Sequence, residues 1–202
     1  MKKKRVLIVC HDAGGAEIIS SWAKKNNSFD FDFLLEGPAL SVFQRKFESL
    51  VVLNKETAFA NISRYDLVAT GTSWISNLDN WAIQRARNEK VHSVTYLDHW
   101  VEYKERFFLE QKLVLPDEIW VGDQYGLELA KKAFPDFPIQ LEPNLYFEEM
   151  VDEIDRLSAK SRVSSVGVRI LYVTEPKPAD LKKKMAGQGA GDTPRSTLLR
   201  VI

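Results

Sequence analysis

Short apolar runs alternate with amphipathic segments along most of the chain. The run Val6–Cys10 is continuously apolar, as in a strand buried on both faces of a sheet. After it, Ile18, Ile19, Trp22 and Ala23 recur at helical spacing. The alternation repeats and predicts strands over 5–10, 30–35, 50–53, 66–70, 91–97, 118–121 and 138–141, with helices over 16–26, 39–47, 56–64, 77–89 and 124–133. This order predicts a doubly wound α/β domain with a mainly parallel, Rossmann-like sheet.

The pattern changes after Pro143-Asn144. Residues 146–160 form a charged helical pattern, and 161–167 are rich in Ser, Val and Gly, as a linker would be. Val168–Thr174 then reads as one further strand, followed by a polar tail without aromatic residues. One strand and a polar tail cannot build a second core. We therefore predict a Rossmann-like domain over 1–145, a helix and linker over 146–167, and a fragment of a second domain or a disordered tail over 168–202.

Charge and cysteine content narrow the class of protein. Lys+Arg and Asp+Glu number 28 each, so the net charge is zero. The chain therefore lacks the excess of positive charge expected of a protein whose main partner is nucleic acid. Cys10 is the single cysteine, which excludes an internal disulfide or a cysteine-based zinc site and fits a reducing compartment. The apolar run at the N-terminus ends at His11, too early for a signal peptide, and no run approaches the ~20 residues of a membrane span. We expect a cytoplasmic protein without a transmembrane segment, any contact with the inner face of the membrane being made through partners.

Polar and glycine-rich residues follow most of the predicted strands. Open α/β sheets bind ligands outside the carboxyl ends of their strands. The candidate positions are His11, Asp12, Gly14 and Gly15 after the first strand, Glu36 after the second, Thr72 and Ser73 after the fourth, Asp98 and His99 after the fifth, and Gly122 and Asp123 after the sixth. We expect the functional site at this edge of the sheet.

The pair Gly14-Gly15 would let a ligand approach the backbone at a helix N-terminus, where free N–H groups and the helix dipole favour an anion. The alternative is that the two glycines only relieve steric crowding. G-x-G-x-x-G is absent, although Glu36 lies about 20 residues on, where a ribose-binding acid belongs, so NAD binding is a minor alternative. The P-loop pattern is absent too, which argues against a P-loop kinase or ATPase. No cofactor is predicted.

His11 is the candidate general base, because an imidazole titrates near neutral pH, and Asp12 beside it could orient the ring. The alternative is a polar loop residue that bonds to the backbone. Asp98 is the second candidate catalytic group. His11, Asp12, Asp98 and His99 could converge on a metal ion, but no ligand spacing requires it, so no metal site is predicted.

The segment from Thr95 to Phe107 combines Asp98, His99, several aromatic residues and Arg106. Aromatic rings stack on sugars, carboxylates accept hydroxyl hydrogens, and Arg forks onto phosphate, so Tyr103 and Arg106 join the predicted ligand-binding residues. The alternative is that Trp100, Tyr103 and Phe107 only pack the loop onto the domain. Phe107 and Phe108 are predicted to be core residues, and His92 to be structural.

These residues together resemble a known group. The glycine pair, the Asp98-His99-Trp100 loop and the run Leu115–Asp123 before a helix resemble the N-terminal half of GT-B glycosyltransferase-like proteins, over residues 5–176. The nearest members are bacterial polysaccharide-biosynthesis proteins, loosely similar to nucleotide-sugar hydrolases and to the peptidoglycan N-acetylglucosaminyl transferase.

The resemblance implies two Rossmann-like domains facing each other across a cleft. The N-terminal one would hold the acceptor and supply the base, and the C-terminal one would hold the nucleotide-sugar donor. His11 would match a catalytic histidine position, Gly14 and Gly15 the acceptor or phosphate loop, and Asp98 and His99 the face toward the cleft.

The chain departs from that pattern after Glu175, where a donor domain would begin. We expect a truncated gene product, one partner of a split transferase, or a one-domain descendant. The leading hypothesis is the acceptor-side domain of a glycosyltransferase-like protein of cell-envelope polysaccharide synthesis, inactive without a separate donor-binding half. The alternatives are a non-catalytic module that binds a nucleotide, a sugar or a partner, and a structural module that uses residues 146–160 as a partner helix. The predicted site comprises His11 and Asp98 as catalytic residues, with Asp12, Gly14, Gly15, Thr72, Ser73, His99, Tyr103 and Arg106 as ligand-binding residues.

Overall fold

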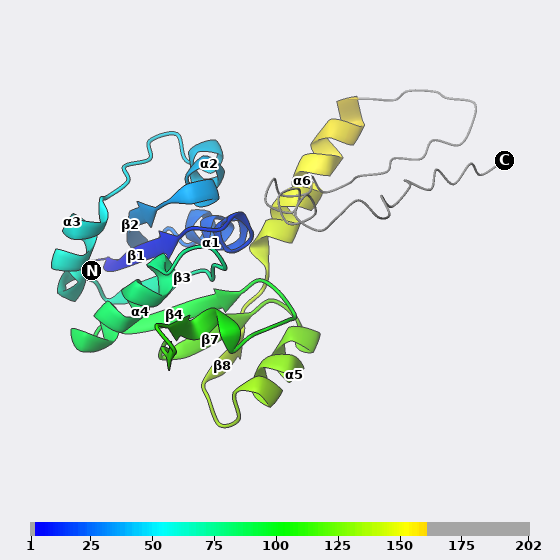
Figure 1. Ribbon diagram of the computed structural model, residues 1–202. Coiled ribbons are helices and arrows are strands. Elements are labelled where there is room, and N and C mark those ends of the chain that lie inside the picture. The colour runs from blue at the N-terminus through cyan, green and yellow to red at the C-terminus, as the bar shows by residue number, and fades with distance from the viewer. Residues whose placement is uncertain (1–2, 161–202) are drawn as a thin grey trace, which may run out of the picture. The chain divides into compact units, whose positions relative to one another are not determined.

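The computed structural model describes residues 3–160, which belong to one compact unit. Its centre is a sheet of six parallel strands in the order β2-β1-β3-β4-β7-β8 (Figure 1). The strands are β1 (Lys4–Cys10), β2 (Phe29–Leu35), β3 (Leu67–Thr70), β4 (His92–Leu97), β7 (Glu118–Val121) and β8 (Ile139–Leu141). The predicted Rossmann-like α/β fold is confirmed.

Helices cover both faces of the sheet, as the alternation of strands and helices requires. One face carries α1 (Ala13–Lys25), α2 (Gly37–Lys46) and the start of α6 (Leu145–Lys160). The other carries α3 (Lys55–Ala60), the 3-10 turn Ile62–Arg64, α4 (Leu78–Asn88) and α5 (Gln124–Ala133). The strand residues Val6 to Val9 are fully buried between these layers, so the continuous apolar run has the environment that its composition predicted.

Local sequence explains where several helices begin. Asn54 Oδ1 accepts a hydrogen bond from Thr57 N at 2.7 Å, and Asp123 Oδ1 accepts one from Gly126 N at 2.6 Å. These side chains cap α3 and α5 by satisfying backbone donors that lack a partner within the helix.

Two elements predicted from the sequence are wrong or incomplete. Residues 50–53 do not form a strand: only Val52 makes a bridge, to Phe33 of the edge strand β2, and Val51 is exposed. Leu50 and Val52 are partly buried against the core of one face and Leu53 against that of the other, but the segment pairs with β2 at one point only. The helix predicted over 56–64 is broken at Asn61.

The long loop after β4 contains elements that the pattern did not indicate. The turn η2 (Glu105–Phe107) precedes a small antiparallel hairpin of β5 (Phe108–Leu109) and β6 (Lys112–Leu113). Phe107 is fully buried, but Phe108 is 46% exposed, so its assignment to the core was wrong. Phe107 is the last residue of the 3-10 turn and Phe108 is the first residue of β5, and of the two only Phe107 packs into the core.

Helix α6 is anchored to the domain by its first turns. Glu149 lies between Lys24 Nζ at 3.3 Å and Lys46 Nζ at 3.0 Å, and it accepts a hydrogen bond from Ser21 Oγ at 2.7 Å. Tyr146 packs against the core of the same face. The predicted linker 161–167 and the predicted strand Val168–Thr174 lie outside the described residues. Within residues 3–160, every helix is too short or too polar to span a bilayer.

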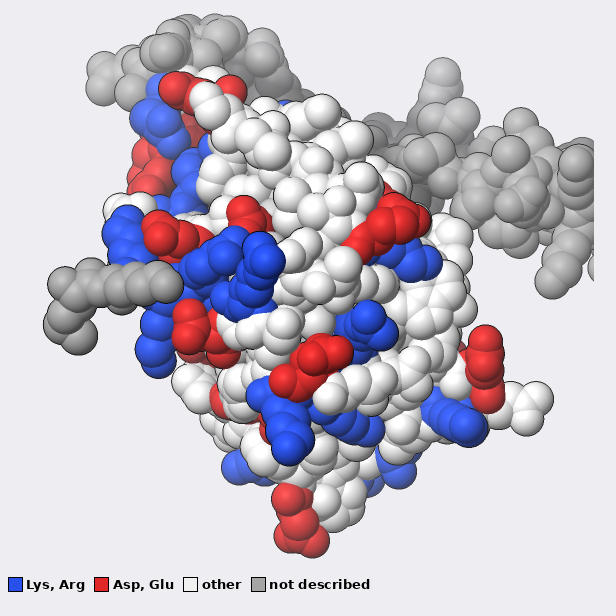
Figure 2. All heavy atoms as spheres, turned by 90° about the vertical axis from the view of Figure 1, so that its left-hand side faces the viewer, with Lys and Arg blue, Asp and Glu red and all other residues white. Residues whose placement is uncertain are grey.

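Surface charge is mixed on the side where β1 begins. Figure 2 shows Lys and Arg side chains there interspersed with Asp and Glu. Arg5 Nη2 lies 2.7 Å from Asp32 Oδ2, and Lys3 Nζ lies 3.9 Å from Asp30 Oδ1. These cations are therefore partly neutralised by their neighbours, and the opposite edge of the sheet, where the strands end, carries the candidate site.

Candidate functional site

The strand order creates a switch point between β1 and β3. The chain leaves β1 through α1 to reach β2 on one side, and then returns across β1 to β3 on the other side. The loops after β1 and β3 therefore diverge toward opposite faces, and a crevice opens at this point in such sheets. His11 and Asp12 stand on one of these loops, and Thr72 and Ser73 on the other.

His11, Asp12 and Ser73 form the first cluster of the site. His11 Nδ1 lies 2.7 Å from Asp12 Oδ1, and Ser73 Oγ donates to the same oxygen at 2.7 Å. A carboxylate only accepts, so Nδ1 carries the proton and leaves Nε2 as the acceptor atom of the neutral ring. Asp12 thus fixes the orientation of the His11 ring, and the His11 side chain is only 15% exposed.

Gly37 borders the free nitrogen of His11, a feature that the sequence analysis missed. Its φ of +53° is the left-handed conformation that favours glycine, and a Cβ at this position would lie 2.6 Å from His11 Nε2. The same Cβ would lie 2.8 Å from Cε1 and 3.0 Å from Cδ2, so glycine makes room for the face of the His11 ring at its Nε2 end. The sequence Glu36-Gly37-Pro38 indicates a turn after the second strand, but only the pairing of β1 with β2 brings this turn close to His11.

Asp98, Thr72 and Arg106 form the second cluster. Thr72 Oγ1 donates to Asp98 Oδ1 at 3.3 Å and accepts from Arg106 Nη1 at 2.9 Å. Arg106 Nη1 lies 3.9 Å from Asp98 Oδ1, so the hydroxyl bridges the two charges. Burial raises the pKa of Asp98, while His99 and Arg106 oppose that rise. Since Thr72 and Ser73 are adjacent, their hydroxyls bring the two clusters together.

The glycines of α1 have a steric role that the structure makes explicit. A Cβ on Gly14 would lie 2.1 Å from Asp98 Oδ2, and one on Gly15 would lie 3.0 Å from Gly71 Cα. Gly15 therefore allows the start of α1 to pack on the loop after β3, and Gly14 makes room for the Asp98 carboxylate. His99 Nε2 lies 3.3 Å from Asp98 Oδ2 on the open side, with its side chain 52% exposed.

Replacing Gly14 by Ala is expected to lower the free energy of unfolding by about 1–3 kcal/mol, because Asp98 must leave its partners to admit the methyl group. Urea unfolding measures this change. The matched control is Gly126→Ala in the first turn of α5, where the nearest atom, Asp123 Oδ1, would be 3.4 Å from the new Cβ. Alanine there should be neutral or stabilise by up to ~1 kcal/mol. Equal effects at both positions would contradict the steric role of Gly14.

Asp79 is a buried carboxylate beneath the site, which the sequence analysis did not single out. It lies in the first turn of α4 and is 3% exposed. Neither of its carboxylate oxygens has a hydrogen-bond partner among the described residues. Burial, and next the charge of Asp12, raise its pKa from 3.8 to about 8. Burial and the nearby Asp79 also raise the pKa of the Cys10 thiol, so both groups hold their protons at neutral pH.

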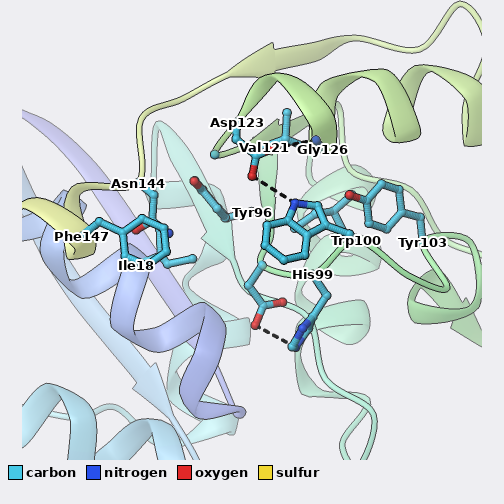
Figure 3. Close-up of a pocket in the computed structure, with 13 residues that line it drawn as sticks. Ile18, Tyr96, His99, Trp100, Tyr103, Val121, Asp123, Gly126, Asn144 and Phe147 are labelled. Atoms are coloured by element: carbon cyan, nitrogen blue, oxygen red, sulfur yellow. Dashed lines mark hydrogen bonds and ion pairs between the residues drawn. The ribbon is translucent and has the colours of Figure 1, made fainter. Parts of the chain in front are cut away.

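A cavity of about 80 Å³ lies on the other side of Asp98, between the ends of β4 and β7 (Figure 3). Trp100 stands at its mouth with Nε1 donating to Asp123 Oδ2 at 3.0 Å, and its ring is 57% exposed. Tyr103 is buried behind Trp100, and its hydroxyl has no partner among the described residues. The structure thus places the predicted residues in two neighbourhoods that share Asp98: the switch point, and this cavity with His99 and Tyr103.

Arg106 is buried, and its guanidinium lies 4.8 Å from the centre of the exposed Trp74 ring. It therefore supports the site from within and has little exposed surface with which to bind a phosphate.

Within residues 3–160, His, Cys, Asp and Glu side chains do not gather in any group of three or more suited to a metal ion.

Comparisons with known proteins bear on the fold. No protein-family model matches the sequence, and no curated protein matches it. Among solved structures, the chain is similar to the UDP-GlcNAc 2-epimerase from Neisseria meningitidis bound to UDP-GlcNAc, with a TM-score of 0.52 and 11% sequence identity. The likeness shows a GT-B-like Rossmann fold. It covers 76% of this chain and 50% of the epimerase chain, so the protein spans about half the length of that structure. Because one fold hosts many activities, the glycosyltransferase role implied by the sequence resemblance stays a proposal.

Proposed function

We propose that residues 3–160 are the acceptor-side half of a protein that processes nucleotide sugars, a glycosyltransferase-like protein of cell-envelope polysaccharide synthesis. The observation that carries the proposal is the oriented His11 at the switch point, with its free Nε2 beside Gly37 and the buried Asp98 a short distance along the same edge. The GT-B-like fold supports it, since the neighbour of known structure is bound to a nucleotide sugar.

The chemistry would be a glycosyl transfer. An acceptor hydroxyl gives its proton to His11 Nε2 as its oxygen bonds to the anomeric carbon, and the nucleoside diphosphate leaves with the electron pair of the broken bond. Asp12 stabilises the imidazolium that results, because its carboxylate lies 2.7 Å from Nδ1. The Asp98 carboxylate would accept hydrogen bonds from the sugar hydroxyls, and the His99 ring would donate one to them.

The proposal assigns donor binding to a separate C-terminal half, so we expect residues 3–160 by themselves to have no transferase activity. We expect this reaction to take place in the cytoplasm, a reducing compartment in which a single cysteine such as Cys10 stays a free thiol. Attachment to the inner face of the membrane would come through the partner half or the acceptor.

A ligand titration of the full 202-residue chain tests the proposal. Amide chemical shifts followed against a panel of sugars and nucleotide sugars at millimolar concentrations should change in the loops that contain residues 11–15, 71–76 and 98–106. Unchanged spectra with every ligand, or changes confined to the start of β1, would overturn the proposal.

A non-catalytic binding module is the second candidate, favoured by the low exposure of His11 and by the steric role of the two glycines. His11→Ala separates the candidates. If His11 is the base, its loss should lower turnover roughly 100-fold or more once a donor half is supplied, and it should change ligand affinity little. Undiminished turnover of the variant would remove His11 from the mechanism and leave the binding module.

A further inference from the structure

The cavity between β4 and β7 is too small for a whole ligand. Its volume is about 80 Å³, whereas pockets that enclose a complete small molecule have roughly 300–1,000 Å³. A water molecule occupies about 30 Å³ of liquid, so the cavity has room for a few heavy atoms. Any sugar at this edge would therefore rest its ring outside, against the exposed face of Trp100, and insert a single substituent.

The walls of the cavity are of two kinds. Ile18, Val121 and Phe147 supply apolar surface, and Asp123 and Tyr103 supply polar atoms (Figure 3). Further polar atoms come from Asp98, His99 and Asn144. Two carboxylates disfavour an anionic substituent, and a lone hydroxyl group would bond to the polar wall but leave the apolar wall without a contact. The walls favour a neutral group that has both a methyl end and hydrogen-bonding atoms.

Tyr103 carries the strongest indication that a polar atom belongs in the cavity. The residue is 5% exposed, and a buried hydroxyl without a partner costs about 1–3 kcal/mol. Burial, and next the charge of Asp123, raise its pKa to about 12, so the group is a hydrogen-bond donor at neutral pH. In Figure 3 its oxygen points toward Trp100 at the cavity mouth.

We propose that this cavity receives the acetamido group of an N-acetylated sugar, with the Tyr103 hydroxyl donating to the acyl oxygen and the amide N–H directed at Asp98. The methyl group packs on Ile18 and Val121, while the sugar ring stacks on Trp100. This assignment rests on the proposed function and adds the class of sugar to it.

The test compares N-acetylglucosamine with glucose, which carries a hydroxyl in place of the acetamido group, as ligands of the full chain in NMR titrations. N-acetylglucosamine should bind more tightly, and its acetyl methyl should show nuclear Overhauser effects to Ile18 and Val121. Tyr103→Phe should weaken N-acetylglucosamine roughly three- to tenfold, the loss of one neutral hydrogen bond, and leave glucose unchanged. Because this hydroxyl has no partner among the described residues, the variant should remain folded with an unchanged or higher Tm.

Tyr125→Phe is the matched control, since Tyr125 is 60% exposed and stacks edge-on with Trp100 outside the cavity. It should change neither affinity. Equal binding of both sugars, or equal effects of the two substitutions, would overturn the acetamido site and leave the proposed function standing. No binding of either sugar, together with no response to any nucleotide sugar, would overturn both.

Discussion

Asp79→Asn is expected to stabilise the protein, and the gain in the free energy of unfolding should grow as the pH rises toward 8. Asp79 is buried beneath the site, and its carboxylate has no partner among the described residues. Its pKa is raised from 3.8 to about 8 in the folded protein, so the folded state keeps a proton that the unfolded chain releases. Asparagine has the same shape and releases no proton on unfolding.

The sign and size of this change in the free energy of unfolding follow from proton linkage. Below pH 3.8 both states bind the proton and the group has no pH-dependent effect. Between that pH and about 8 the unfolded state binds fewer protons, so the parent loses stability as the pH rises, by up to about 1.4 kcal/mol per pH unit, and the loss levels off above about 8. At pH 7 the penalty is on the order of 4 kcal/mol, which the variant avoids.

Urea unfolding of the parent and of Asp79→Asn at several pH values between 4 and 9 measures the difference in the free energy of unfolding. The cost of burying the amide does not vary with pH, so it does not affect how this difference changes between pH values. Asp136→Asn, at an exposed loop position, is the control and should give a difference independent of pH. A pH-independent difference for Asp79→Asn as well would show that the carboxylate is solvated or paired in the folded protein.

Arg106→Met should destabilise the protein by about 3–5 kcal/mol, because it removes the buried cation beside Asp98 and leaves only the half-exposed His99 near that carboxylate. The Arg106 side chain is 3% exposed and the Asp98 side chain 4%, and Thr72 bridges them. Methionine retains much of the apolar stem that packs near Trp74, so most of the loss should come from the charge. Denaturant unfolding at pH 7 measures the change.

The double variant Asp98→Asn/Arg106→Met is the control for this interpretation. It removes both charges together and should recover most of the stability lost in Arg106→Met, since a neutral pair carries no buried unpaired charge. A double variant as unstable as the single one would mean that Arg106 acts through packing with Trp74 instead of through Asp98.

Several parts of the site could be predicted from the sequence because they lie directly after strands. A strand of a parallel sheet ends at the same edge as its neighbours, so the positions of His11, Asp12, Thr72, Ser73 and Asp98 at one edge followed from the alternation alone. The same reasoning could not show that Asp12 orients His11, or that Thr72 stands between Asp98 and Arg106. Those contacts depend on β3 pairing with both β1 and β4.

Other features depend on contacts between distant segments. Gly37 borders His11, Gly14 borders Asp98, and the charge of Asp12 acts on the buried Asp79, yet the two residues of each pair are separated by a helix or more in the chain. The cavity likewise combines Tyr103 with residues of β7 and α6.

The alternation of continuous apolar runs with segments of helical periodicity is a local property, and it was enough to predict the α/β class, the layers and the edge that carries the candidate site. Strand order, the depth at which each polar side chain is buried and the partner of each charge arise when the elements pack against one another. For that reason only the folded molecule showed the bridged Asp98–Arg106 pair, the cavity of Tyr103 and the burial of Asp79 without a partner among residues 3–160.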